Sequence, residues 1–506
     1  MKTKGRRRLE KRRGGPGASS AFGWSLLNTI VARFATLGIG IVLARVLGPE
    51  EFGTFAVALV VLMAILSFNE LGVSLAIVRW PQDPKHIAPT VNTISVVASI
   101  IIFCGAYVLT PAVATAMGDP EATKVIQLLL LSVLINGAVA TPAALLQRRF
   151  QERTRMVIDQ TNVWVGAIIS LVLALMGFGA MSLAIGRLAG SLISGVMFLA
   201  ASPLPYRFGW NREVAPQLLR FGLPLAGSSI VVFAVGYADQ LTVGAALGAT
   251  ALGFYVLAFN LSSWPMSIVS QPLRRVAPAA FSHLQANPAE LGRTMSTLMG
   301  LLAVCTVPLF AFVSGASRSL VEFIYGSQWL PSAAVLSFLV FSALVRLAYE
   351  LMYDYLVVLG RTGTVFAVQL VSLCIMVPAL LLGGYLGGLV GLSAAHALVS
   401  WLVILPMYGF QLSRAGVKIS AIVRRALSPV LIGLGVGIAS YYITLSIPST
   451  FWGLAAGGTL AFICTAAMLY VRRADLAVVR GIGQAKTEAE PIGDATTVSV
   501  AKEELQ

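Results

Sequence analysis

A fifteen-residue segment near the start of this chain recurs 200 positions later, and this repeat constrains the fold more than any other feature. Residues 44–58 read ARVLGPEEFGTFAVA, and residues 244–258 read GAALGATALGFYVLA. The leucine and glycine at positions 47 and 48, the glycine at 53 and the alanine at 58 recur without change. In a largely apolar chain, a repeat at this spacing predicts two homologous bundles of membrane helices, a plan common among transporters.

Apolar runs of about 20 residues follow one another along the whole chain, and each is long enough to cross a bilayer as a helix. The composition agrees, because only 11% of residues are charged, against roughly 25% in a soluble protein. We therefore expect an all-helical membrane protein with about fourteen spans. The predicted spans are 21–44, 53–78, 88–110, 123–147, 157–177, 179–201, 217–246, 251–273, 295–315, 332–358, 363–384, 387–410, 425–446 and 451–471.

The distribution of positive charge supports fourteen spans over the alternative of twelve. The glycine-containing turns at 177–179 and near residue 384 could instead be kinks within longer helices, which would remove two spans. With a cytoplasmic N-terminus and fourteen spans, however, thirty of the 36 Lys and Arg residues fall in cytoplasmic segments. Such an asymmetry is typical of inner-membrane proteins, so we expect a multi-pass protein of the cell (inner or plasma) membrane with both termini in the cytoplasm.

The repeat and the spans together predict the domain organisation. Two lobes of six helices each are expected, followed by two further helices, with a short linker between the lobes and a tail at each end. The predicted limits are 1–20 for the basic N-terminal tail, 21–201 for the N-lobe, 202–216 for the linker, 217–410 for the C-lobe, 411–475 for helices 13 and 14, and 476–506 for a disordered cytoplasmic tail.

The net charge of +15 does not indicate a nucleic-acid partner, because the basic residues gather at the inner ends of the predicted spans. The N-terminal KTKGRRRLEKRR is expected to lie on anionic lipid headgroups. The four cysteines and three histidines are scattered, so no metal site and no catalytic residue is predicted. Tryptophans near helix ends, Trp329 among them, are expected to anchor the helices at the membrane surface.

Charged residues inside the predicted spans are the main candidates for a functional site, because a charge in lipid is costly unless it faces water or a partner. Arg33, Glu70 and Arg187 lie in the first half of the chain, and Asp239 lies in the second. Arg33 and Asp239 are midway along their spans, far from either membrane surface. The charge of Arg187 could instead be satisfied by neighbouring carbonyl groups.

The span 332–358 carries a polar stripe along one side. Its members share one helical face and are Arg346, Tyr349, Glu350, Tyr353 and Asp354. This pattern is typical of the wall of a water-filled cavity, and Arg346 and Glu350 are spaced to form an ion pair. Two alternatives remain: the pair only ties helices together, and Asp354 reaches the cytoplasmic interface.

Three segments resemble the polysaccharide-exporter branch of the MOP (multidrug/oligosaccharidyl-lipid/polysaccharide) superfamily. They are ARVLGPEEFGTFAVA, YADQLTVGAALGATALGFYVLAFNLSSWPMSIVSQPLRRVAPAAFSHLQ and YGSQWLPSAAVLSFL. Within that branch the chain is most similar to Wzx-type lipid-linked oligosaccharide flippases, particularly the colanic-acid and teichuronic-acid exporters. The resemblance covers roughly residues 20–475 and leaves both tails outside.

This resemblance implies two six-helix lobes around a central cavity, with the last two helices appended. It also implies alternating access for a polyprenyl-diphosphate-linked glycan, which would pass from the cytoplasmic to the outer leaflet. A headgroup of diphosphate and sugars cannot cross hydrocarbon unaided, because its dehydration is too costly. Membrane lipid and this glycan are the expected partners, along with a polysaccharide polymerase and its assembly machinery.

A cavity for such a headgroup needs cations for the diphosphate and groups that bond or stack on sugars. The candidate substrate-binding residues are Arg33, Arg187, Arg346, Asn69, Tyr237, Tyr349 and Tyr353. Four acidic residues, Glu70, Asp239, Glu350 and Asp354, could couple transport to H⁺ or Na⁺, because burial favours the neutral form of a carboxylate. They could equally be counter-ions of the arginines. No other cofactor is predicted.

Three other functions stay open. A multidrug exporter of the same superfamily would share the fold and carry an organic cation. A membrane glycan polymerase or ligase usually needs a long external loop with catalytic Arg or His, and the longest predicted outer loop is under about 20 residues. A membrane protein that assists glycan assembly without transporting anything would tolerate alanine at Arg33 and Arg346.

Overall fold

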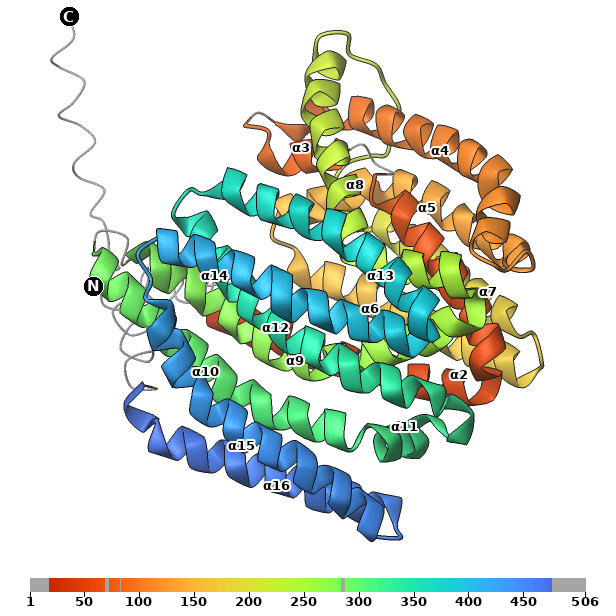
Figure 1. The fold of residues 1–506 in the computed structure, drawn as a ribbon. Coiled ribbons are helices and arrows are strands. Elements are labelled where there is room, and N and C mark those ends of the chain that lie inside the picture. The colour runs from red at the N-terminus through yellow and green to blue at the C-terminus, as the bar shows by residue number, and fades with distance from the viewer. Residues whose placement is uncertain (1–17, 69–71, 82, 284–286, 476–506) are drawn as a thin grey trace, which may run out of the picture. The chain divides into compact units, whose positions relative to one another are not determined.

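All regular elements in the described part of the chain are helices, as the sequence predicts (Figure 1). The computed structural model describes residues 18–68, 72–81, 83–283 and 287–475. For residues 18–37, and for most of residues 267–289, only the backbone is described. Eleven helical stretches of this part of the chain are long and apolar enough to cross a bilayer, which confirms a multi-pass membrane protein.

Every predicted span has a helix at its position. The longer helices of the first half are α2 (Ala18–Leu66), α4 (Ala88–Ala116), α5 (Ala122–Arg148), α6 (Glu152–Leu175), α7 (Ala180–Ala200) and α8 (Val214–Leu247). Those of the second half are α9 (Ala249–His283), α10 (Pro288–Gly315), α12 (Pro331–Val358), α13 (Thr362–Val399), α14 (Leu405–Arg414), α15 (Ile419–Ser446) and α16 (Thr450–Val471). Two short helices, α3 (Ser74–Arg79) and α11 (Ser317–Tyr325), lie between them.

The breaks between helices show where the spans on either side of residues 177–179 and of residue 384 are divided. Gly177 and Gly179 both have positive φ, and they separate α6 from α7, so the turn predicted there is confirmed. The turn predicted near residue 384 lies slightly later, because the non-helical residues inside α13 are Gly387 and Gly388. Each pair of spans is therefore two helices rather than one kinked helix.

The predicted span 53–78 is wrong in its second half. The helix ends at Leu66, and the next helix among the described residues is α3, from Ser74 to Arg79. Between them Gly72 has a φ of 65°, a conformation that suits glycine and ends a helix. Ser67, Asn69 and Glu70 interrupt the apolar run here, but Asn69 and Glu70 were assigned to a cavity inside the span, so the break in the helix was not predicted.

The chain divides into two compact units, which do not coincide with the predicted lobes. Unit 1 contains residues 1–257 and the segments Ile324–Pro331 and Gly384–Leu389, and unit 2 contains the remainder. Helix α8 therefore packs with the helices of the first half, although the repeat places it at the start of the second. The lobe limits follow the repeat and remain a prediction of the domain organisation.

The two copies of the repeat adopt the same backbone geometry. Gly48 has φ 76° and ψ 175°, and Gly248 has φ 84° and ψ 178°. This region is open essentially to glycine alone. One glycine breaks α2 into two helical pieces and the other separates α8 from α9, so each copy of the motif is a hinge between two helices.

Just beyond the hinges, the two copies cross at a second pair of repeated glycines. A Cβ atom on Gly53 would overlap the carbonyl group of Ala249, and one on Gly253 would lie 3.0 Å from the Cα of Gly53. The helices that follow the hinges thus meet backbone to backbone, as small residues allow in membrane proteins. All of these residues belong to unit 1.

Within unit 2, α15 and α16 run beside α10 (Figure 1). Glycines again permit the close approach: Gly315 of α10 faces the carbonyl group of Gly437 of α15, and Gly457 of α16 faces the ring of Phe312. At the far end of the same bundle, Arg425 forms an ion pair of 3.1 Å with Asp475. The last two helices are therefore an integral part of unit 2.

Candidate functional site

The structure describes most but not all of the predicted site residues. Asn69 and Glu70 lie outside the described residues, and Arg33 lies in α2 where only the backbone is described. The remaining candidates divide between the units. Arg187, Tyr237 and Asp239 belong to unit 1, and the polar stripe of α12 belongs to unit 2.

In unit 1, two of the predicted substrate-binding residues are brought together. Arg187 of α7 is partly buried, and the Tyr237 side chain of α8 lies within electrostatic range of its guanidinium. Phe233 stacks on Tyr237, with ring centroids 4.7 Å apart and an interplanar angle of 18°. A cation, a hydroxyl group and an aromatic pair therefore share one part of this unit.

Asp239 lies close to these residues in the sequence but in a different environment. It is only 6% exposed, and its Oδ2 accepts a 2.8 Å hydrogen bond from the hydroxyl group of Tyr255. The other carboxyl oxygen, Oδ1, accepts from the backbone N–H of Gln240. Both oxygens have donors, but neither donor carries a charge, and no salt bridge of Asp239 is present among the described side chains.

In unit 2, the ion pair predicted on α12 is confirmed. Arg346 Nε lies 3.3 Å from Glu350 Oε1, and the two side chains are 42% and 15% exposed. The other members of the stripe, Tyr349, Tyr353 and Asp354, are also partly exposed, whereas Leu351 and Tyr355 are buried. The stripe is thus the more accessible face of this helix.

Tyr349 does not stand alone on that face. Its ring stacks on Tyr408 of α14 with a centroid distance of 5.5 Å and an interplanar angle of 10°. Tyr408 is 2% exposed and was not predicted, because a single tyrosine in the apolar span 387–410 carries no distinguishing signal. The aromatic pair joins α12 to α14 beside the Arg346–Glu350 ion pair.

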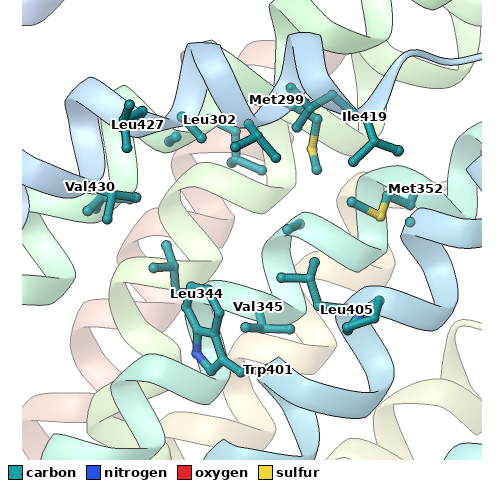
Figure 2. A pocket seen from close by; sticks show the side chains of 18 of the residues that line it. Met299, Leu302, Leu344, Val345, Met352, Trp401, Leu405, Ile419, Leu427 and Val430 are labelled. Carbon is teal, nitrogen blue, oxygen red and sulfur yellow. The ribbon is translucent and has the colours of Figure 1, made fainter. Parts of the chain in front are cut away.

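The other side of α12 borders an apolar cavity of about 630 Å³ (Figure 2), within the usual size range of small-molecule sites, roughly 300–1,000 Å³. Its walls come from α10, α12, α14 and α15, all in unit 2. The polar side chains among the lining residues are Thr306, Trp401 and Ser413. The Thr306 hydroxyl group donates to the Leu302 carbonyl of its own helix, so the surface of the cavity is mainly hydrocarbon.

A local change of helical pitch places Trp401 in this cavity wall. Residues Ser400–Ile404 form a π-helical turn, η3, between α13 and α14, a distortion that is frequent at functional sites. The indole N–H of Trp401 donates to the carbonyl group of Phe341 on α12 at 3.2 Å. With its polar atom bonded in this way, the indole is available to the cavity as an apolar surface.

Together, the duplicated hinge, the long apolar helices and the charged residues within them, Asp239 among them buried, define a multi-pass helical membrane protein with the architecture of a transporter. The family model described as "Polysaccharide biosynthesis protein" matches residues 42–334. This match covers more than half of the chain, and the protein belongs to that family.

Curated relatives extend the similarity over most of the chain. The succinoglycan biosynthesis transport protein ExoT of Rhizobium meliloti (strain 1021) is 26% identical over 94% of this chain and 97% of its own length. The lipopolysaccharide biosynthesis protein WzxC of Escherichia coli (strain K12) is 23% identical over 74% of this chain and 77% of its own. The resemblance inferred from the three sequence segments is confirmed.

Two solved structures share the fold. An inward closed conformation of the lipid II flippase MurJ superposes with a TM-score of 0.73 at 14% identity, covering 88% of this chain and 98% of that one. An inward-facing multidrug resistance MATE family transporter of the MOP superfamily gives a TM-score of 0.59 at 16% identity, with 76% and 95% covered. The all-helical fold expected from the MOP resemblance is confirmed.

Proposed function

We propose that this protein is a flippase that moves a lipid-linked oligosaccharide or polysaccharide precursor from the cytoplasmic to the outer leaflet by alternating access. It would serve the synthesis of a cell-surface polysaccharide and act as a transporter rather than an enzyme. Relatives named as transport proteins of succinoglycan biosynthesis and the fold shared with a lipid II flippase support this proposal.

The observation that carries the proposal is the two-sided character of α12. One face bears the Arg346–Glu350 pair and an aromatic stack, and the other borders a cavity of hydrocarbon. A lipid-linked glycan has the same division, since its diphosphate requires cationic hydrogen-bond donors and its chain requires an apolar surface. An organic cation, the cargo of the multidrug alternative, would not need the arginine.

Depletion of the protein in its native cell is expected to trap complete glycan repeat units, still attached to lipid, on the cytoplasmic leaflet. Surface polysaccharide should fall in parallel, because polymerisation outside the membrane lacks its substrate. The measurement is the leaflet distribution of the lipid-linked oligosaccharide together with surface glycan. Normal glycan export with increased sensitivity to cationic drugs would favour the multidrug exporter, and unpolymerised units on the outer leaflet would favour the polymerase.

We assign the apolar cavity of unit 2 to part of the lipid chain, and filling it is expected to slow transport. Gly409 lines the cavity and has no atom within 4 Å of an added Cβ. Gly409→Leu would therefore displace about three methylene groups of the lipid. At roughly 0.1–0.2 kcal/mol for each lost carbon contact, about ten contacts correspond to about tenfold weaker binding.

The matched control for this variant is Gly435→Leu. Gly435 is exposed, lies on α15 outside the cavity lining, and also has no neighbour within 4 Å of an added Cβ. It should transport at the wild-type rate in the same leaflet assay. Equal transport rates for the two variants would show that the cavity is not part of the transport path.

The remaining parts of the proposal concern orientation and coupling. A cytoplasmic location of both termini, in the inner or plasma membrane, follows from the positive charge of the N-terminal tail and the inner loops. The coupling cation would be H⁺ or Na⁺, with Asp239 as the strongest of the described candidates because its carboxyl group is buried between neutral donors. A polysaccharide polymerase would accept the product outside.

A further inference from the structure

The first hinge, at Gly48, packs against the turn that joins α6 to α7. Leu43 before the hinge and Phe52 after it share one apolar cluster with Ala174 of α6 and Leu183 of α7. Ala174 is near the end of α6 and Leu183 is near the start of α7. Both pieces of α2 therefore contact the same end of this helix pair, and all of these residues belong to unit 1.

A carboxylate from the hinge adds a polar contact to this packing. Glu51 lies three residues after Gly48, and its Oε2 accepts a 2.6 Å hydrogen bond from the backbone N–H of Ala180. Ala180 is the first residue of α7. The first N–H groups of a helix have no acceptor within the helix, and a negative charge is favoured beside them. Glu51 thus satisfies the start of α7 from a different helix.

The turn before α7 has room for this carboxylate only because residue 179 is glycine. A Cβ atom on Gly179 would overlap the carboxylate group of Glu51. Gly179 also has φ 55° and ψ −140°, a conformation that glycine adopts without steric cost. Backbone and space both require glycine here, so the turn is shaped to receive the Glu51 side chain.

The second copy of the repeat shows that the bend itself does not need the contact. Ala251 occupies the position that corresponds to Glu51, yet Gly248 has nearly the same φ and ψ as Gly48. A hinge of this geometry therefore forms without a carboxylate. What Glu51 adds to the first hinge is a connection to α7.

The helical piece that carries Glu51 is held from another direction by Trp329. The Trp329 ring meets Phe52 edge to face at a centroid distance of 5.4 Å and Phe254 at 5.7 Å. The tryptophan side chain is fully buried, so the prediction that it anchors a helix at the membrane surface is wrong. Packing thus fixes this piece of α2, and a side chain on it can hold α7 in place.

The position of α7 matters because this helix carries Arg187, one of the candidate substrate-binding residues. Arg187 lies seven residues after Ala180, which is about two turns along the helix. The Tyr237 side chain of α8 lies within electrostatic range of its guanidinium. A shift of the first turn of α7 would carry Arg187 with it and change its position relative to Tyr237.

We propose that Glu51 is a positioning residue that fixes the start of α7 to the first hinge and so holds Arg187 where it can bind the anionic headgroup of the cargo. The inference rests on the proposed function, because the diphosphate of a lipid-linked glycan is the anion that Arg187 would bind. Glu51 itself does not contact the cargo.

Hydrogen exchange of the purified full-length protein tests the contact without knowledge of the cargo. Glu51 is exposed, so water can replace its carboxylate, and Glu51→Ala should raise exchange in peptides covering 177–187 about fivefold, the change expected for one hydrogen bond. Glu51→Gln keeps an oxygen that can accept from Ala180 and should retain most of the protection. Glu50→Ala removes the neighbouring exposed carboxylate and should change nothing. Equal exchange in Glu51→Ala and Glu50→Ala would overturn the proposal.

Removing the donor instead of the acceptor makes this test specific. Ala180→Pro deletes the N–H, and proline is well tolerated at the first position of a helix. Because each change removes the same hydrogen bond, Glu51→Ala should have little further effect on α7 exchange in the Ala180→Pro background. Additive effects would show that Glu51 does not act through the start of α7.

Transport in vesicles containing the lipid-linked oligosaccharide of the native cell tests the effect on Arg187. Glu51→Ala should raise the cargo concentration at half-maximal transport about fivefold at an unchanged maximal rate, the signature of weakened binding, and should have no such effect in an Arg187→Ala background. A lower maximal rate with unchanged half-saturation would indicate a loss of folded protein and would overturn the positioning role.

The proposed function and this inference fail in different ways. A wild-type protein that leaves the glycolipid on its original leaflet would refute the flippase, whatever the exchange measurements show. A wild-type protein that moves the glycolipid, combined with additive exchange effects of Glu51→Ala and Ala180→Pro, would leave the flippase standing and refute the role of Glu51.

Discussion

Replacing Gly53 by alanine is expected to destabilise the protein markedly. The added Cβ would overlap the carbonyl group of Ala249, a backbone atom in a crossing helix that cannot rotate away. Overpacking of this kind costs about 1–3 kcal/mol, and we expect the upper end of that range. The measurement is the thermal midpoint of the purified protein in detergent, followed by size-exclusion chromatography.

Two other glycines calibrate this result. Gly227 lies on α8 with no atom within 4 Å of an added Cβ, so Gly227→Ala should be neutral or stabilising by up to about 1 kcal/mol. Gly253→Ala should fall between the two, because its contacts are at 2.9 Å with the Pro49 carbonyl oxygen and 3.0 Å with the Gly53 backbone. Equal thermal midpoints for Gly53→Ala and Gly227→Ala would mean that the two helices can move apart at the crossing without a loss of stability.

Replacing Asp239 by asparagine is expected to abolish transport while leaving the fold intact. Asparagine has the same shape: its amide oxygen can accept from the backbone N–H of Gln240, and its amide nitrogen can donate to the Tyr255 hydroxyl oxygen, which now bonds Asp239 at 2.8 Å. What it loses is the acidic group, which in a membrane interior requires a proton or a bound cation. We expect at least a tenfold loss of transport, equivalent to about 1.4 kcal/mol, at an unchanged thermal midpoint.

Asp119 provides the matched control for that substitution. Its Oδ2 accepts a 2.6 Å hydrogen bond from Thr54, and its Oδ1 accepts from the backbone N–H of Glu121 at the start of α5. The amide oxygen of asparagine can accept from the Glu121 N–H, and its amide nitrogen can donate to the Thr54 hydroxyl oxygen, so Asp119→Asn should transport normally. An Asp239→Asn variant as active as this control would show that the buried carboxyl group has no part in coupling.

The positions of the helices could be predicted from the sequence, because hydropathy and the positive-inside charge pattern both depend on local composition. Breaks at the two copies of the repeat could be predicted as well, since Gly48 and Gly248 both fall between predicted spans. The break after Leu66 was not predicted, because the polar residues that follow it, Asn69 and Glu70, were assigned to a cavity inside the span, and the turn depends on the backbone at Gly72.

The candidate site was predictable only where spacing along one helix decides the contact. The Arg346–Glu350 pair follows from an interval of four residues, and it is present. By contrast, the stacking of Tyr349 on Tyr408 and the seat of Trp329 between Phe52 and Phe254 join residues far apart in the chain. No periodicity in one segment specifies such partners, so a tryptophan near a helix end was assigned to the membrane surface.

The place of α15 in the cavity wall has a consequence for how the protein is made. Ile419, Ile422 and Val430 of α15 line the cavity, and α16 then packs on both α10 and α15. At about 5–20 residues per second, the ribosome needs roughly 3–10 s to add the 53 residues from 419 to 471. During that interval the inserted helices present the apolar residues of α10 and α12 to bulk lipid, so the nascent chain has both repeated hinges in place before the wall of the apolar cavity is complete.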